Sequence, residues 1–346
     1  METSYIGATN SGRIQQIQSF IEDKATPQGG LGCVEEIALR LALLQETSKP
    51  FLNQPSLLHF AGDHGIAEEG VCAFPQLATG QGLLNYAKGG ASVCAFARLN
   101  RLMLRIVDCG LIQGVDHPQI LARRLGSGTQ NFKNQEAMTV AQLDRGLRLG
   151  GDIVKARCKA GTNILGFGTS GVGGDIAADA ILSHLVGVPM SELCDETAEH
   201  GFVDKKKILY QDLDQIYGPI RDPHKILQTF GGLEFAMMLG AILQCVQAKA
   251  IILVDGYIGS VIALLASRLE PQVKNYLFIC QKSRNLGQKW ISHELSEPLM
   301  NLGMDMDDGS GVALAYPLFQ SAVTFLNEVS TYDEAKMARP YFNSPD

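Results

Sequence analysis

Short runs of apolar residues recur along the chain, and each run ends in Gly, Asp, His or Ser. The first, Ser56–Ala61, leads directly into Gly62-Asp63-His64-Gly65. Polar residues hardly interrupt these runs, and several runs are rich in β-branched or aromatic residues. This pattern is typical of strands that are buried on both faces. The remaining runs of this kind are Leu102–Val107, Asn163–Leu165, Ile251–Val254 and Tyr276–Cys280.

Segments with apolar residues at helical spacing alternate with these runs. Such alternation predicts an α/β fold with a mostly parallel sheet flanked by helices. In a sheet of this kind, ligands bind outside the carboxyl ends of the strands. We therefore expect the polar ends of the runs to share one edge and to form one small-ligand site. The predicted helices are Leu83–Leu99, Ile176–Val186, Leu233–Ala248 and Ile258–Leu269.

The two ends of the chain have a helical pattern without strands. Helices are expected up to about Gln45, with a break at Thr26–Gly30, and one more helix over Val312–Glu328. This organisation predicts a smaller helical domain from residues 1–50 and 312–346, and an α/β nucleotide-binding domain from residues 51–311. The polar stretch Met190–Arg221 is either a long loop with one short helix or an excursion over the site.

Composition narrows the class of protein. Of the 346 residues, 46% are hydrophobic and 19% are charged, so the chain can form a full core. The formal net charge of -7 argues against nucleic-acid binding, which requires a clustered surplus of Lys and Arg. No run approaches the roughly 18 apolar residues of a membrane span, and the first residues lack the order of a secretory signal. We expect a cytoplasmic protein whose eight dispersed cysteines are free thiols rather than zinc ligands.

The glycine-rich segment Gly166–Gly171 fits the pattern GxGxxG, between a predicted strand and a predicted helix. A glycine turn before a helix N-terminus binds phosphate through backbone N–H groups. The acidic residue that a dinucleotide site needs about 20 positions further on is not found. The segment therefore indicates either a contact with phosphate or ribose, or only a tight turn.

Three acidic segments and one lysine are further candidates, each with two interpretations. Asp63-His64 is either an acid–base pair or a helix cap beside a hydrogen-bonded histidine. Asp255 with Gly256, and Asp307 with Asp308, are likewise either ligand contacts or caps. Lys206 is either a phosphate partner or a solvated surface lysine.

Several segments together resemble the nicotinate-nucleotide–dimethylbenzimidazole phosphoribosyltransferase family. The similarity is collinear over most of the chain, and the Asp-His-Gly and Gly-Ser-Gly-x-Ala-Leu segments are its most specific parts. The matching segments are Pro27–Gly32 with Glu35, Asp63–Ile66, Glu69–Val71, Pro75, Gly89, Asp108–Gly110, the Gly166 segment, Gly231–Glu234, Asp255–Tyr257 and Gly309–Leu314.

The resemblance implies a homodimer that moves phosphoribose from nicotinate mononucleotide to dimethylbenzimidazole or a similar base, without a metal or organic cofactor. It implies Asp308 as the carboxylate that takes the proton of the base. The residues implied to bind the nucleotide are Gly168, Thr169, Ser170, Gly171, Gly174, Lys206, Asp255, Gly256, Ser283, Gly309 and Ser310. The residues implied to form the base pocket are Asp63, His64, Phe74, Pro75 and Gln81.

This chain also departs from the family's pattern around the site. Asp308 replaces a glutamate, Asp307 a glycine and Asp305 an arginine, while Thr169 replaces a glutamate and Asp175 falls in the family's Asn-Thr-Thr segment. Three hypotheses therefore stay open. They are the family's activity with this or another base, a different enzyme on the same scaffold, and a non-catalytic protein that binds a nucleotide.

Overall fold

The computed structural model describes residues 11–194 and 203–339 of the chain, and its contacts divide them into two compact units. One unit is formed by residues 53–315. The other joins the N-terminal segment up to residue 52 with the segment from residue 316 onward. Within the described ranges, the structure has no helix that is both long and apolar enough to span a membrane.

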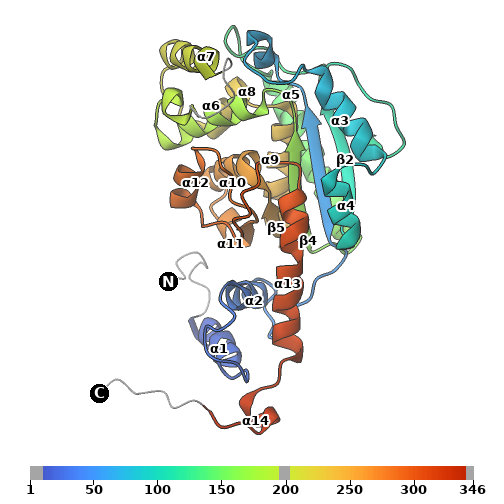
Figure 1. Ribbon diagram of the computed structural model, residues 1–346, viewed down its shortest axis with the longest axis vertical. Coiled ribbons are helices and arrows are strands. Elements are labelled where there is room, and N and C mark those ends of the chain that lie inside the picture. The colour runs from blue at the N-terminus through green and yellow to red at the C-terminus, as the bar shows by residue number, and fades with distance from the viewer. Residues whose placement is uncertain (1–10, 195–202, 340–346) are drawn as a thin grey trace. The chain divides into compact units, whose positions relative to one another are not determined.

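The larger unit is built on a six-stranded sheet with the strand order β3-β2-β1-β4-β5-β6 (Figure 1). Every neighbouring pair of strands is parallel, as the alternation of strands and helices predicts. The polar ends of the strands therefore lie at one edge. The strands are β1 Ser56–Gly62, β2 Met103–Gly110, β3 Ile120–Ala122, β4 Ile164–Ser170, β5 Ile251–Val254 and β6 Leu277–Ile279.

One face of the sheet packs against α9 and α10, and α5 covers α9 from outside (Figure 1). Leu58, Phe60 and Phe167 of this face are fully buried and belong to the main hydrophobic core. The opposite face packs against α3 and α4. All seven residues of β1 are buried because both faces are covered, which explains its uninterrupted apolar run. The helices are α3 Leu77–Ala87, α4 Ser92–Leu99, α5 Val140–Lys159, α9 Leu233–Gln247 and α10 Gly256–Leu269.

The helices α5 and α9 touch through their backbones. A Cβ atom added to Gly150 would lie 1.8 Å from the carbonyl oxygen of Met237, and one added to Gly240 would lie 2.0 Å from that of Leu147. Only glycine allows this approach. The two helices are therefore closer than ordinary side chains permit.

The segment Gly166–Gly171 is predicted to form a turn, and this prediction is wrong for its first five residues. Gly166 and Gly168 lie inside β4, and the strand ends only at Ser170. A Cβ atom on Gly166 would lie 2.3 Å from Val312, and one on Gly168 would lie 2.3 Å from the backbone of Asp308. These glycines are needed because the chain around residues 308–312 crosses directly over the strand.

Other helices also differ from the prediction. The single helix expected over Leu83–Leu99 is two helices, α3 and α4, because the chain turns at Gly89-Gly90, where Gly89 has a φ of 77°. The sequence pattern also missed α5, whose surface is largely polar, and the three-residue strand β3.

The part of Met190–Arg221 that the structure describes contains one short and one long helix, η2 and α7; residues 195–202 lie outside the described ranges. The remaining elements of this unit are η1 Gly65–Glu69, α6 Gly174–Val186, η2 Met190–Leu193, α7 Val203–Ile216, α8 Pro223–Phe230, α11 Val273–Tyr276 and α12 Gln288–Glu294.

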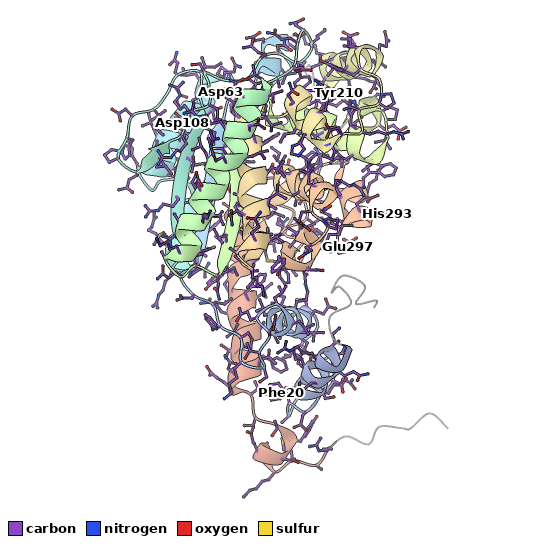
Figure 2. The ribbon with its side chains drawn as sticks, turned by 180° about the vertical axis from the view of Figure 1, so that it is seen from behind. Phe20, Asp63, Asp108, Tyr210, His293 and Glu297 are labelled. Carbon is purple, nitrogen blue, oxygen red and sulfur yellow. The ribbon has the colours of Figure 1, made fainter. Side chains whose placement is uncertain are left out.

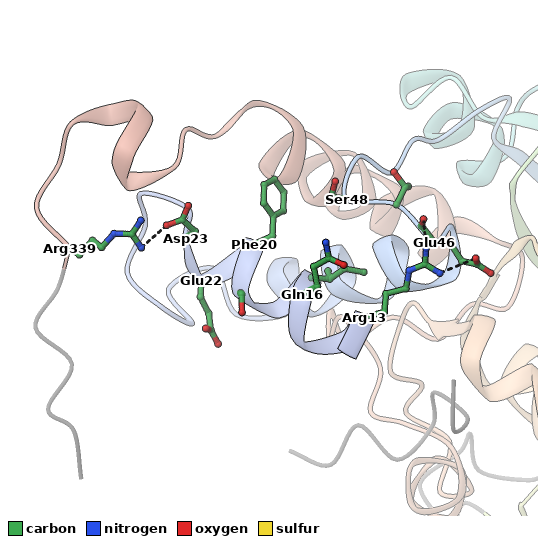
Figure 3. Close-up of a pocket in the computed structure, with 11 residues that line it drawn as sticks. Arg13, Gln16, Phe20, Glu22, Asp23, Glu46, Ser48 and Arg339 are labelled. Atoms are coloured by element: carbon green, nitrogen blue, oxygen red, sulfur yellow. Dashed lines mark hydrogen bonds and ion pairs between the residues drawn. The ribbon is translucent and has the colours of Figure 1, made fainter. Parts of the chain in front are cut away.

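The smaller unit is helical. Lys24 donates to the carbonyl oxygen of Val329 at 2.7 Å, and the Tyr332 hydroxyl donates to that of Thr26 at 3.1 Å, so the two chain ends are joined. This unit has a depression of about 850 Å³. Arg13, Phe20, Glu46 and Arg339 are among the residues that border it (Figure 3). No residue predicted for the ligand site borders it. The elements are α1 Ser11–Glu22, α2 Cys33–Leu44, the C-terminal part of α13 Ser310–Glu328, and α14 Tyr332–Ala335.

Candidate active site

The carboxyl edge of the sheet collects most of the predicted site residues. Asp63 directly follows β1, and Asp108 lies near the end of the neighbouring strand β2. Figure 2 labels both residues at the same end of the sheet. The segment before α13 crosses β4 there, and the Thr169 N–H donates to the carbonyl oxygen of Asp307 at 2.7 Å. Gly168 lies against Asp308 in the same contact. The fold thus brings the predicted catalytic aspartate onto the predicted nucleotide-binding strand.

The carboxylate of Asp308 is almost fully buried, with 3% of the residue exposed. Its Oδ1 accepts a hydrogen bond from the Ser310 N–H at 2.9 Å, at the start of α13. Its Oδ2 has a longer contact, 3.5 Å, from the hydroxyl of Ser92. One oxygen therefore caps the helix, while the other retains lone-pair capacity to accept a proton.

His59 joins Asp308 to the end of β4. Its Nδ1 lies 3.0 Å from the carbonyl oxygen of Asp308, and its Nε2 lies 2.9 Å from the hydroxyl of Ser170. A carbonyl only accepts, so Nδ1 carries the proton that is donated. Burial lowers the pKa of His59, which favours the neutral ring, and Nε2 then accepts from Ser170. His59 thereby fixes the backbone position of Asp308.

Asp255 holds the start of α13 from the neighbouring strand. Its Oδ2 accepts from the N–H groups of Gly309 and Gly311, both at 2.9 Å, and the residue is fully buried. Burial raises the pKa of Asp255 well above its ordinary value. Asp255 is therefore placed as a structural support for the Asp308 segment.

Asp307 lies at the N-terminus of α10. Its Oδ1 accepts the N–H of Ile258 at 2.9 Å, and a Cβ atom on Gly256 would lie 2.3 Å from the same oxygen. Gly256, which has a φ of 60°, lets the carboxylate approach. Burial raises the pKa of Asp307 to about 7, so this carboxyl group changes its charge near neutral pH.

Ser283 follows β6 at the same edge. Its hydroxyl oxygen accepts the Asn285 N–H at 3.1 Å, and its hydroxyl donates to Asp305 at a long 3.5 Å. Asp305 also forms an ion pair with Arg284 at 3.7 Å. Ser283 thus lies beside the acidic side chain of Asp305.

Lys206 projects from α7 toward the start of α6, where Gly174 begins the helix. Its Nζ lies 3.0 Å from Asp175 and 3.5 Å from Asp179. Lys206 is therefore close to the start of α6, where Gly174 is a predicted nucleotide contact. The lysine is not a solvated surface side chain, since only 17% of it is exposed.

Asp63 and His64 are both engaged with the protein. Asp63 accepts the Ile112 N–H at 2.8 Å, and His64 Nε2 lies 2.6 Å from Glu234. Burial by itself would lower the pKa of His64. The charge and the hydrogen bond of Glu234 raise this pKa by more than burial lowers it, so the net shift is upward. The side chains of His64 and Glu234 are closed off from solvent, with 1% and 0% exposed.

The other residues predicted for the base pocket lie near α3. Phe74 is 69% exposed, and Pro75 and Gln81 are also exposed. These three residues lie at the surface of the described structure. Asp63 alone of the predicted set borders a small cavity of about 210 Å³, together with Gln76, Leu77, Gly80, Ile112 and Gln113.

Four polar residues of this region were not among the predicted site residues. His59 and Asp179 each stand within an otherwise apolar run, and such an interruption is the signal that could have identified them. Glu234 and Ser92 begin helices and look like ordinary N-terminal residues in the sequence. Within residues 11–194 and 203–339, no three His, Cys, Asp or Glu side chains are grouped to hold a metal ion.

Comparison with known proteins places the chain in a family. A family model described as phosphoribosyltransferase matches residues 6–337. The nicotinate-nucleotide–dimethylbenzimidazole phosphoribosyltransferase of Dechloromonas aromatica is 37% identical, and the match covers 97% of this chain and 98% of the relative. That of Photobacterium profundum is 36% identical, over 92% and 95% of the two chains.

A solved structure agrees. The crystal structure of the enzyme of this name from Thermus thermophilus matches with a TM-score of 0.89 and 30% identity, over 95% of this chain and 99% of that one. The shared fold confirms the predicted parallel α/β architecture. The chain belongs to the phosphoribosyltransferase family that contains these nicotinate-nucleotide–dimethylbenzimidazole enzymes.

Proposed function

We propose that the protein transfers phosphoribose from nicotinate mononucleotide to 5,6-dimethylbenzimidazole or a similar base, as in the synthesis of the cobalamin lower ligand. The near full-length similarity to relatives of that name supports this function. The observation on which the mechanism depends is the carboxylate of Asp308, held by β4, Ser310 and Ser92 with one oxygen lightly engaged.

The proposed reaction is a displacement at the ribose. One nitrogen of the benzimidazole attacks C1 of the ribose, and the bond from C1 to the nicotinate nitrogen breaks with its electron pair. Asp308 Oδ2 accepts the proton from the second nitrogen of the base. Positive charge that develops on the ribose is stabilised by the carboxylates at this edge.

The phosphate of the donor is assigned to the region where β4 and α6 meet. The start of α6 and Lys206 lie together there, and a helix N-terminus with a nearby ammonium group suits an anion. We also propose that the protein acts as a cytoplasmic homodimer, which light scattering on the purified protein tests by giving twice the mass of one chain.

The activity is tested by incubating the protein with nicotinate mononucleotide and dimethylbenzimidazole, and by separating released nicotinate and the new nucleotide chromatographically. We expect product with the natural chain and a loss of turnover of roughly 10²- to 10⁴-fold with Asp308→Ala. Asp308 also caps α13, so unfolding of the variant is followed in parallel, with an expected loss of about 1 kcal/mol.

Three outcomes discriminate between the hypotheses. Product that disappears with Asp308→Ala supports the transferase and its base. Binding of the mononucleotide without product with any benzimidazole tested indicates a different enzyme on the same scaffold or a binding protein. Neither binding nor product contradicts the proposed function.

A further inference from the structure

Lys206 is held between two carboxylates that differ in their surroundings. Its Nζ lies 3.0 Å from Asp175 Oδ2 and 3.5 Å from Asp179 Oδ2. The side chain of Asp175 is 53% exposed, whereas that of Asp179 is 0% exposed. One carboxylate therefore approaches the ammonium group from the solvent side and the other from the protein interior.

The inner carboxylate is fixed. Tyr257 donates to Asp179 Oδ1 at 2.7 Å, and Tyr210 donates to its Oδ2. Both tyrosines are buried and come from different helices, α10 and α7. Asp179 is therefore held by two hydrogen bonds that do not involve Asp175, and its ion pair keeps Lys206 oriented toward the start of α6.

The outer carboxylate is in a different position. Asp175 is in the first turn of α6, directly after Gly173-Gly174, and about half of its side chain is open to solvent. Partial removal from water by itself would raise the pKa of Asp175. The charge and hydrogen bond of Lys206 and the Ile176 N–H lower this pKa by more, to below its ordinary value. Asp175 is thus a charged group, and it uses the same two donors, a lysine and a helix N-terminus, that suit a phosphate.

A phosphate group and Asp175 cannot both be close to Lys206 without repulsion. Two like charges about 4 Å apart repel by several kcal/mol even at the effective dielectric constant of a protein surface. The ammonium group of Lys206 donates a hydrogen bond to Asp175 and forms an ion pair with Asp179, so a phosphate has to share its charge with two carboxylates. A ligand phosphate that takes its full share of Lys206 therefore has to turn Asp175 out toward solvent, which its exposure allows.

We propose that Asp175 is a resident anion, which holds Lys206 ready in the empty site and is displaced by the phosphate of the ligand. This inference rests on the proposed function for the identity of the ligand, nicotinate mononucleotide. Asp175 is then a positioning residue that acts through Lys206. Its carboxylate reduces the affinity for a phosphorylated ligand and leaves the affinity for the same ligand without phosphate unaffected.

The test compares ligands with and without the phosphate in Asp175→Asn. Dissociation constants are measured by calorimetry for nicotinate mononucleotide, for the corresponding nicotinate riboside and for inorganic phosphate. We expect the variant to bind the mononucleotide and inorganic phosphate roughly tenfold more tightly, from the removal of one like charge. We expect the riboside to bind with unchanged affinity, and Asp175→Glu, which keeps the charge, to behave like the natural chain.

Asp152→Asn is the matched control, because it removes the same charge from an exposed position on another helix, α5. The inference is overturned if Asp175→Asn leaves phosphate affinity unchanged, weakens it, or tightens the riboside equally. It is also overturned if Asp152→Asn tightens phosphate as much, since net charge alone would then explain the effect.

The same data separate this inference from the proposed function. If the natural chain forms product in the turnover assay and Asp175→Asn has an unchanged dissociation constant for the mononucleotide, the inference fails and the function stands. If no mononucleotide binds to either protein but inorganic phosphate binds more tightly to the variant, the proposed function fails and the resident anion stands for another phosphorylated ligand.

Discussion

Two buried or half-buried ion pairs lie near the carboxyl edge of the sheet, and they differ in almost every respect. The pair His64–Glu234 is short, 2.6 Å, and is closed to solvent on both sides. The pair Lys206–Asp175 is longer, 3.0 Å, and one partner is half exposed. Neither side chain of the first pair is open to a ligand from solvent. In the second pair, a ligand can approach the exposed carboxylate of Asp175 and replace it. We interpret the first as part of the architecture and the second as part of ligand binding.

The surroundings of the closed pair support this interpretation. A Cβ atom on Gly62 would lie 2.3 Å from Glu234 Oε2, and one on Gly232 would lie 2.4 Å from it. Gly171 is equally tight, because its Cβ would lie 2.1 Å from the carbonyl oxygen of Gly62. The glycines therefore let the backbone close around the Glu234 carboxylate at the ends of β1 and β4.

The largest effect is expected from opening the closed pair with Glu234→Ala. His64 Nε2 then loses its partner inside the protein, and a cavity remains, so the free energy of unfolding should fall by about 3–5 kcal/mol. Urea unfolding measures this loss. Arg268→Ala, which removes the surface partner of Glu294, is the control and should cost less than about 1 kcal/mol. Equal losses in the two variants would contradict the architectural role.

The same pair predicts a pH dependence. The pKa of His64 is raised above its ordinary value near 6.5, so the folded state binds a proton that the unfolded state releases. The stability that the pair contributes is full below pH 6.5 and is lost as pH rises through the folded pKa. In Glu234→Ala this part of the dependence should disappear.

A second comparison adds one methyl group at each of two glycines, Gly171 and Gly174. Gly171→Ala meets the backbone of Gly62, which cannot move aside, and should cost about 1–3 kcal/mol or more of stability. Gly174→Ala at the start of α6 has only ordinary contacts, the nearest at 3.4 Å, and should fold as well as the natural chain. Thermal unfolding of the two variants checks this, and a reversed order would contradict the tight backbone contact between Gly171 and Gly62.

A third change tests ligand binding at the open pair. Lys206→Ala should weaken binding of nicotinate mononucleotide by roughly 10- to 100-fold, through the loss of one charged contact with phosphate. Lys205→Ala, at the exposed neighbouring position of the same helix, should change it little. Calorimetric titration of both variants measures the difference. If both weaken binding to the same extent, Lys206 has no special place in the site.

The smallest effect concerns Asp307, a half-buried carboxyl with no cation beside it among the described contacts. Its pKa is about 7 in the folded state and near 3.8 when unfolded. Between these values the folded state holds a proton that the unfolded state has lost, so stability falls as pH rises from about 4 to 7. Because the side chain is only half buried, solvent screens the effect, and we expect a total loss on the order of 1 kcal/mol.

Asp307→Asn keeps the acceptor for the Ile258 N–H and removes this titration. The variant should match the natural chain at pH 4 and exceed its unfolding free energy at pH 8 by on the order of 1 kcal/mol. Urea unfolding at the two pH values tests it. If the unfolding free energy changes between pH 4 and pH 8 by the same amount in the variant and in the natural chain, Asp307 does not titrate in this range.

The sequence predicts the sheet well because burial on both faces leaves a direct pattern of apolar runs. It predicts β4 poorly because the glycines of that strand, which usually mark turns, serve to admit a crossing segment of chain 140 residues away. The long helix α5 was missed for a related reason. Only one side of it is buried, and its contact surface includes Gly146 and Gly150, which carry no apolar side chain.

The sequence predicts where the site lies, but it does not predict which acidic side chain contacts which basic side chain. Parallel strands place Asp63, Asp255 and Ser283 at one edge, and this follows from topology alone. Which acid faces which base depends on α6, α7 and the segment before α13, whose arrangement no local pattern encodes. His64 therefore could not be assigned to Glu234 from spacing, nor Lys206 to Asp175 and Asp179.

The backbone contact between α5 and α9 has a consequence for motion. Helices that touch through Gly150 and Gly240 have no side-chain layer that could shear, so α9 forms a stiff backing for the ends of β1 and β4. The amides of α9 should then be among the last to exchange with deuterated water, whereas those at the start of α6 exchange early. We therefore expect the α6–α7 side to move more readily than α9.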